Sequence, residues 1–232
     1  MIKVLELFSG TGSVGKCCKQ LGWEVVSVDM ILPADHQVDI MKFDYKQYSK
    51  DEFDIIWASP PCTNYSVLKK CWYGRKLKDG TIYNKELNEK DQDEADKLVL
   101  KSLEIINYFN PEYWFMENPQ TGNLKNREIM KDIPFYDVDY CMYSDWGYKK
   151  RTRIWTNKKD WSNLLCDNSG SCGNMISIDN GNRHLHKKEV DKIGCGSQLN
   201  QPKDLKYLGK GTNRIDRYRI PEDLIFSLFL EF

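Results

Sequence analysis

Short apolar runs that stop abruptly at turn-forming residues constrain the fold of this 232-residue chain more than any other feature. The clearest run is FDIIWAS at residues 53–59, and comparable runs lie at 4–8, 24–30 and 112–118. Between two of these runs, apolar side chains in residues 93–109 recur at close to the spacing of one helical face. Strands that alternate with helices predict an α/β fold with a Rossmann-like, doubly wound and mostly parallel sheet.

Several further segments complete this expectation. Short strands are predicted at residues 37–41, 135–143 and 151–157. Residues 69–96 are charged and contain glycine, which indicates a solvated loop or a mobile lid. A helix that begins near Pro221 is expected to pack on the main domain through its apolar face.

The region after the last predicted strand has a different composition. It is rich in Gly, Asn, Lys and Cys and shows little apolar periodicity, which predicts a small irregular subdomain. The expected units are therefore a catalytic domain at 1–156, the irregular subdomain at 157–213 and a C-terminal helix at 214–232.

Composition limits where the protein works and what it binds. Lys plus Arg and Asp plus Glu both number 34, so the net charge is zero and nucleic-acid binding must come from local patches. No run approaches the roughly 20 apolar residues that span a bilayer, so no membrane partner is expected. The eight cysteines lack the spacing of a disulfide framework, which favours a reducing, intracellular compartment. A monomer is the expected assembly.

A glycine turn follows the first predicted strand, in LELFSGTGSVG. Gly10 and Gly12 allow close approach of the backbone to a ligand, and the next helix offers free N–H groups. The pattern suits a nucleotide-like cofactor, but by itself it is equally consistent with a tight strand–helix turn. Asp29 ends the second strand, where a carboxylate can accept both hydroxyls of a ribose. Asp39 and Ile40 offer an acceptor for an exocyclic amine and an apolar cover for an adenine, although Asp39 also fits an ordinary turn.

Two prolines precede a cysteine at the end of the run at 53–59. Pro61 fixes its own φ, and each proline restricts the residue before it, so Cys62 is held in a stiff turn. A preset position suits a nucleophile, because small displacements cost orders of magnitude in rate. A buried structural thiol is the commonest role of a free cysteine, but the position at a strand end favours catalysis.

Two further polar groups are expected at the same edge. Glu117 and Asn118 end another apolar strand, and a glutamate among apolar neighbours has a raised pKa that suits proton donation to a ring nitrogen. Taken alone, this position fits a capping or solvated glutamate better. Arg151 and Arg153 share one face of a strand and suit a phosphate or a base carbonyl, unless they only mark a basic edge strand.

The motifs LFSGTGSVG, SPPCTNYS, FMENP and KKRTR, in this order, resemble those of the DNA cytosine-5 methyltransferase family, in particular its compact phage and viral members. The resemblance covers most of residues 1–156 and returns at YRIPEDLI. It implies the fold of a class I methyltransferase that uses S-adenosylmethionine, and DNA as the partner. The implied host is a bacterium or a virus-infected cell.

The resemblance also implies roles for individual residues. The thiolate of Cys62 attacks C6 of a flipped cytosine while Glu117 protonates N3, and C5 then takes the methyl group. Arg151 and Arg153 lie around the base and its phosphate. The implied cofactor set is Phe8, Ser9, Gly10, Thr11, Gly12, Asp29, Met30, Asp39, Ile40 and Pro60, and the implied substrate set is Pro61, Ser66 and Asn118.

The sequence departs from the family pattern at three positions. Thr63 replaces a glutamine after the cysteine, Pro119 replaces a valine, and Lys149 replaces the first glutamine of the arginine motif. The recognition region at 157–213 is also short for the family. Sequence specificity is therefore expected to be short, relaxed or supplied by a protein partner.

Three other functions compete with this interpretation. An amino-group methyltransferase needs an aromatic residue directly after the prolines, where Cys62 stands and Tyr65 follows three residues late. An RNA cytosine-5 methyltransferase has the same pocket, since the 2′-hydroxyl is recognised outside it. The third is a catalytically weak module that binds cofactor and DNA, against which the Cys62–Glu117 pair argues.

Cysteine and histidine gather in the irregular region. Four residues of this kind can hold a tetrahedral zinc ion and order a segment that lacks a core. The segment contains Cys166, Cys172, His184, His186 and Cys195, and the four candidates are Cys166, Cys172, His184 and Cys195. Unrelated surface thiols and histidines are the alternative.

Overall fold

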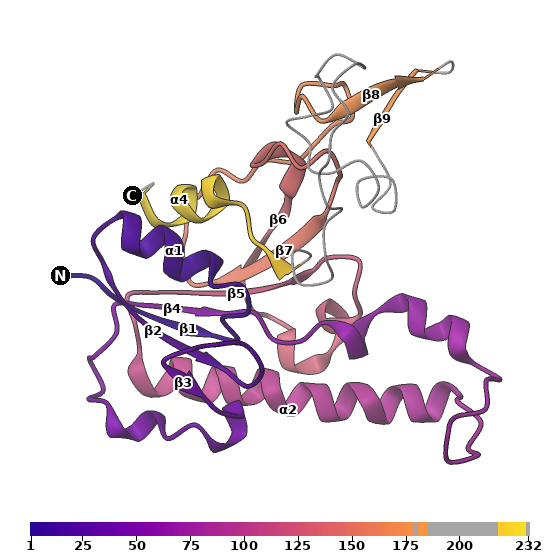
Figure 1. Ribbon diagram of the computed structural model, residues 1–232, viewed down its shortest axis with the longest axis horizontal. Helices are drawn as coiled ribbons and strands as arrows, with labels where there is room; N and C mark the ends of the chain where they lie inside the picture. The colour runs from indigo at the N-terminus through magenta and orange to yellow at the C-terminus, as the bar shows by residue number, and fades with distance from the viewer. Residues whose placement is uncertain (179–180, 185–217, 231–232) are drawn as a thin grey trace.

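The computed structural model describes residues 1–178, 181–184 and 218–230, and a twisted sheet forms its centre (Figure 1). The sheet has seven strands in the order β3-β2-β1-β4-β5-β7-β6. The strands are β1 (Lys3–Leu7), β2 (Glu24–Asp29), β3 (His36–Gln37), β4 (Ile55–Ala58), β5 (Tyr113–Pro119), β6 (Phe135–Asp139) and β7 (Arg151–Thr156). The first five strands in this order, β3 to β5, are parallel to one another, whereas β7 runs antiparallel to both β5 and β6. The predicted doubly wound, mostly parallel sheet is thereby confirmed.

Helices cover both faces of the sheet. α1 (Ser13–Gln20) and α4 (Glu222–Leu230) lie together on one face, and the long α2 (Lys85–Phe109) lies on the other (Figure 1). One apolar core forms under α2 and includes Phe53 and Phe109, while a second forms under α1 and α4 and includes Trp57 and Phe229. Among the described residues, no helix has both the length and the apolar character needed to cross a bilayer.

Short elements connect the larger ones. In the part of the chain that the structure describes, the named 3₁₀ segments are η1 (Ile40–Lys42), η2 (Tyr45–Gln47), η3 (Thr63–Tyr65), η4 (Val67–Trp72), η5 (Leu124–Asn126), η6 (Glu128–Met130) and η7 (Tyr140–Met142). A separate antiparallel hairpin of β8 (Met175–Ile178) and β9 (Gly181–His184) projects beyond β6 (Figure 1).

The predicted loop at residues 69–96 is wrong over its second part, because α2 already begins at Lys85. The side chain of Asn84 caps this helix by accepting from the Leu87 amide at 2.9 Å. The first turns are polar because their outer face is solvated, and a buried polar side chain such as Asp96 is hydrogen-bonded. The strand predicted at 37–41 is also shorter than expected, since it ends at Gln37 and gives way to η1.

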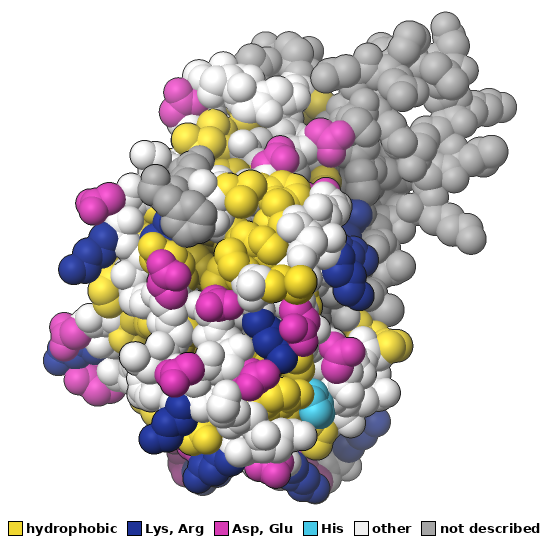
Figure 2. Space-filling view, turned by 90° about the vertical axis from the view of Figure 1, so that its left-hand side faces the viewer, with side chains coloured by type: hydrophobic (Ala, Val, Ile, Leu, Met, Phe, Trp, Pro, Cys, Tyr) yellow, Lys and Arg dark blue, Asp and Glu magenta, His cyan; other side chains and the backbone are white. Residues whose placement is uncertain are grey.

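The surface reflects the balanced composition. On the face shown in Figure 2, Lys and Arg side chains alternate with Asp and Glu side chains. This distribution is what a chain with 34 residues of each charge predicts.

Candidate active site

The carboxyl ends of three neighbouring parallel strands form one edge of the sheet. Ala58 of β4 is paired with Leu7 of β1 and with Met116 of β5. The segments that follow these three residues therefore emerge side by side. They carry the glycine turn, the Pro-Pro-Cys turn and the Glu-Asn pair.

The glycine turn after β1 has left-handed backbone at three positions. Phe8, Gly10 and Gly12 have φ values of 58°, 53° and 66°. The Gly10 amide donates to the Asp29 carboxylate at 2.9 Å, which joins the turn to the end of β2. The other oxygen of Asp29 accepts from the Ile31 amide at 2.8 Å, so this carboxylate is already bound by backbone N–H groups.

The remaining residues of the expected cofactor set differ in exposure. Ser9 is buried, Thr11 is half-buried, and Met30 is exposed at the end of β2. Asp39 caps η1 by accepting from the Met41 amide, and Ile40 lies in the core under α2. Ile40 therefore offers little free surface to a ligand in this structure.

A buried carboxylate lies beneath the glycine turn, and the sequence reading missed it. Glu6 in β1 is 3% exposed and accepts from the backbone amides of Val14 and Gly15, at 3.2 and 3.0 Å. Burial raises the pKa of Glu6 to about 7. A Cβ at position 15 would lie 2.9 Å from the Glu6 carboxylate, which explains the glycine there. The only sequence feature that indicates Glu6 is that a glutamate lies inside an otherwise apolar strand.

The Pro-Pro-Cys turn is anchored to the neighbouring strand. The side-chain amide of Asn118 donates to the carbonyl of Pro60 at 2.8 Å, and Asn118 is fully buried. Pro61 is exposed, and the Cys62 thiol is half-buried at the start of η3. Cys62 is thus held in place while part of its surface is open.

Tyr65 and Ser66, further along the same segment, have structural partners. The hydroxyl of Tyr65 donates to Asp96 of α2 at 2.8 Å, which fixes η3 against the helix. The Ser66 hydroxyl accepts from the Leu68 amide at 3.3 Å and caps η4. Ser66, expected to contact the substrate, therefore has a capping role in this structure.

Glu117 lies at the end of β5 with a hydrogen-bond donor and a cation beside it. The carboxylate is mostly buried, accepts from the Tyr140 hydroxyl at 3.1 Å and lies 3.5 Å from the Lys150 ammonium. Burial, together with the charge of Glu117, raises the pKa of Tyr140, so this phenol remains a donor at neutral pH. The sequence reading missed both partners. Lys150 belongs to the KKRTR motif and could have been considered, whereas no sequence pattern indicated Tyr140.

The two arginines of the predicted site are paired with acidic residues of β6. The guanidinium of Arg153 binds both oxygens of Asp137 at 2.7 and 2.9 Å, and Arg151 lies 3.3 Å from Asp139. Residues directly opposite in a sheet point to the same side, and β7 sets Ile154 opposite Glu117. Arg153 therefore lies on the other face of the sheet, and the structure does not bring it to Glu117.

Three of the four zinc candidates meet in space. Cys166, Cys172 and His184 lie together, and their fourth neighbour is Cys141, which the sequence reading did not consider. Cys195 lies outside the described residues.

The sheet order, the reversed β7 and the glycine turn after β1 define the class of the protein: a Rossmann-like methyltransferase. Residues 2–155 match the family described as C-5 cytosine-specific DNA methylase. The chain belongs to this family of DNA (cytosine-5)-methyltransferases.

The chain is also similar to one sequence relative and to two solved structures. A protein of Frog virus 3 (isolate Goorha), named "Probable DNA (cytosine-5)-methyltransferase", is 39% identical over 98% of both chains. The solved structure of the methyltransferase EhMeth from Entamoeba histolytica is 12% identical, with a TM-score of 0.56 over 99% of this chain and 97% of that one. A DNMT2 variant from Spodoptera frugiperda is 19% identical, with a TM-score of 0.42, and the match covers 72% of this chain and 54% of that longer one.

Proposed function

We propose that the protein transfers a methyl group to C5 of cytosine in DNA through a transient bond between Cys62 and C6. The observation that carries this proposal is the anchoring of the Pro-Pro-Cys turn by Asn118, next to Glu117. A partly open thiol and a carboxyl group thereby extend from adjacent parallel strands at one sheet edge. This is the placement that nucleophilic catalysis with a neighbouring proton donor requires.

The reaction balances with these two side chains. The Cys62 thiolate forms a bond to C6 while Glu117 delivers a proton to N3, which makes C5 nucleophilic. After C5 has gained the methyl group, a base removes the C5 proton, the bond between sulfur and C6 breaks, and N3 returns its proton. A cytosine inside a duplex is out of reach, so the base must be flipped out of the helix.

We propose S-adenosylmethionine as the cofactor, because the residues after β1 and β2 fit it. The left-handed turn at Phe8, Gly10 and Gly12 leads into α1, and the half-buried Asp29 stands beside the turn, with lone pairs beyond its backbone hydrogen bonds to accept ribose hydroxyls. When bound, this cofactor supplies an electrophilic methyl group on a sulfonium. The chain's own role is to hold the cofactor next to Cys62 and to exclude water.

Trapping on DNA that contains 5-fluorocytosine tests the proposal. After methyl transfer, C5 carries fluorine in place of the proton that a base would remove, so the bond between sulfur and C6 cannot be eliminated and the covalent complex accumulates. We expect a DNA adduct on Cys62 with the wild type and with Cys71→Ser, which removes an exposed thiol, and none with Cys62→Ser. An adduct on another cysteine, or none in a preparation that methylates DNA, would overturn the assignment of Cys62.

The same assay separates the competing functions. An RNA-directed enzyme would trap 5-fluorocytosine RNA in preference to DNA, and a binding module would bind DNA without forming an adduct. Bisulfite sequencing of DNA from cells that express the protein would then reveal the target sequence.

We further propose a catalytic unit at 1–156, a recognition unit at 157–213 and a closing C-terminal helix at 214–232. The protein is expected to be a monomer, with a protein partner as one source of sequence specificity. Because its substrate is DNA, it is expected to act inside a cell. Light scattering of the free protein and of its DNA complex tests the stoichiometry.

A further inference from the structure

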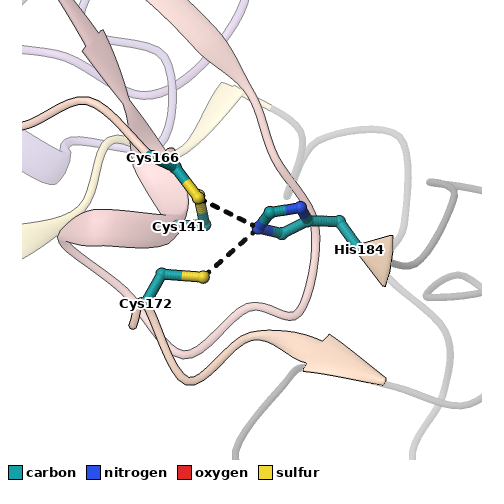
Figure 3. Close-up of side chains that lie close together, drawn as sticks. All are labelled: Cys141, Cys166, Cys172 and His184. Atoms are coloured by element: carbon teal, nitrogen blue, oxygen red, sulfur yellow. Dashed lines mark hydrogen bonds between the residues drawn. The ribbon is translucent and has the colours of Figure 1, made fainter. Parts of the chain in front are cut away.

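We infer that the chain binds one structural zinc ion through Cys141, Cys166, Cys172 and His184. The ligand atoms of these four residues all lie within 4.8 Å of one another. Figure 3 shows the imidazole of His184 directed toward the cysteine sulfurs. Its Nε2 is 3.6 Å from the sulfur of Cys166 and 3.3 Å from that of Cys172.

These distances suit a single tetrahedral ion. Zinc bonds of about 2.3 Å to sulfur and about 2.0 Å to nitrogen require ligand atoms about 3.6 to 3.8 Å apart. Three thiolates and one imidazole form a complete set for a structural zinc, with no position left open for a substrate. A polynuclear iron–sulfur cluster would spread its ligands further apart, because several ions lie between them.

The four residues come from three segments that are distant from one another in the sequence. Cys141 belongs to η7, Cys166 and Cys172 lie in the connection between β7 and β8, and His184 ends β9. That connection contains no helix or strand over residues 157–174. A metal ion that joins it to η7 and to the hairpin supplies the cross-link that a small segment without its own large core needs.

Buried polar side chains hold the backbone around the cluster. The side-chain amide of Asn174, which is 4% exposed, donates to the carbonyls of Cys141, Cys172 and Ser144 at 2.8, 2.9 and 2.7 Å. The buried Asp139 accepts from the Cys166 amide at 3.0 Å. Such outer contacts orient the ligands of metal sites and fix their geometry before the ion binds.

The cluster is also connected to the candidate active site. Cys141 directly follows Tyr140, whose hydroxyl contacts Glu117. A zinc ion at Cys141 would therefore hold η7 in position on one side and the β8–β9 hairpin on the other. Only this consequence depends on the proposed function, because metal binding itself is measured without substrate.

Metal analysis of the full-length protein, purified without chelators or added zinc, tests the inference. We expect about one zinc ion and no iron per chain, retained through gel filtration. Cys172→Ser and His184→Ala alter half-buried ligands and should lose most of the zinc while the sheet remains folded by circular dichroism. Cys71→Ser, which alters an exposed cysteine outside the cluster, should keep it.

Cobalt substitution gives a second measurement that does not depend on zinc content. Co²⁺ in a tetrahedral site with three thiolates has intense visible bands and sulfur-to-metal charge transfer in the ultraviolet, both of which Cys172→Ser should weaken. Wild-type protein that binds neither metal stoichiometrically would overturn the site. Loss of zinc in Cys195→Ser together with its retention in Cys141→Ser would overturn the assignment of Cys141.

Discussion

The hydroxyl of Tyr140 donates a hydrogen bond to the Glu117 carboxylate, across 3.1 Å between a 3₁₀ turn and the end of a central strand. The two residues meet because β7 is inserted between β5 and β6, which brings the end of β6 back toward the carboxyl edge of the parallel strands.

Tyr140→Phe removes this donor and leaves the ring volume unchanged. A hydrogen bond to a charged group contributes about 1.5 to 3 kcal/mol, so we expect single-turnover methylation to slow by about 10- to 100-fold. Tyr45→Phe is the matched control, because its hydroxyl donates to Glu104 of α2 at 2.5 Å, away from the site. Equal rates for Tyr140→Phe and the wild type would mean that the contact plays no part in the reaction.

Asn118→Ala should release the Pro-Pro-Cys turn from β5. The carbonyl of Pro60 loses its buried donor, which costs about 1 to 3 kcal/mol of stability. The activation free energy for forming the Cys62 adduct should rise by at least the same amount. Asn118→Asp should be worse, because a carboxylate would then face the Pro60 carbonyl. Urea denaturation and the rate of trapping on 5-fluorocytosine DNA measure the two effects, and wild-type trapping by both variants would contradict the anchoring role.

Arg127→Met should unfold the protein at lower denaturant concentration. The Arg127 guanidinium is mostly buried, binds Glu89, and lies 2.5 Å from Asp93 and 2.7 Å from Asp96. Loss of the cation leaves the buried Asp96 uncompensated, at a cost of about 3 kcal/mol.

The matched control for Arg127 is an exposed ion pair. Lys131→Met breaks the pair with Glu128, in which both side chains are well exposed, and should cost no more than about 0.5 kcal/mol. If the two variants lost equal stability in urea, the buried cluster around Arg127 would not be the cause.

Glu6 should make the free energy of unfolding depend on pH. The pKa of Glu6 is raised by burial to about 7 in the folded chain, above the value of about 4.3 for an unfolded glutamate. Between these values the folded state binds the additional proton, so stability falls as pH rises through this window, by up to about 4 kcal/mol.

Urea denaturation between pH 5 and pH 8 measures this slope. Glu6→Gln should flatten it, whereas Glu128→Gln, at an exposed position, should leave it unchanged. A slope that persists unchanged in Glu6→Gln would assign the pH dependence to other groups.

More of the fold than of the candidate active site could be predicted from the sequence. The runs that became β1, β2, β4 and β5 were predicted because each is short, rich in apolar residues and followed by turn-forming residues. The start of α2 was missed, because its first turns are solvated and polar and therefore resemble a loop until Asn84 is seen to cap them.

The sequence by itself determined which side chains stand at strand ends, because the positions of strands and turns along the chain follow from local residue types. Cys62 behind two prolines and Glu117 at the end of an apolar strand were chosen as candidates from these positions together with the family resemblance. Only the tertiary structure decided what surrounds them. The register of β7 placed Arg153 on the other face of the sheet, and the pairing of β7 with β5 and β6 placed Tyr140 and Lys150 beside Glu117. The tertiary structure also brought Cys141 to residues 25 to 43 positions later in the chain. These contacts depend on the register and direction of strands that are distant in sequence, and local residue patterns do not encode either.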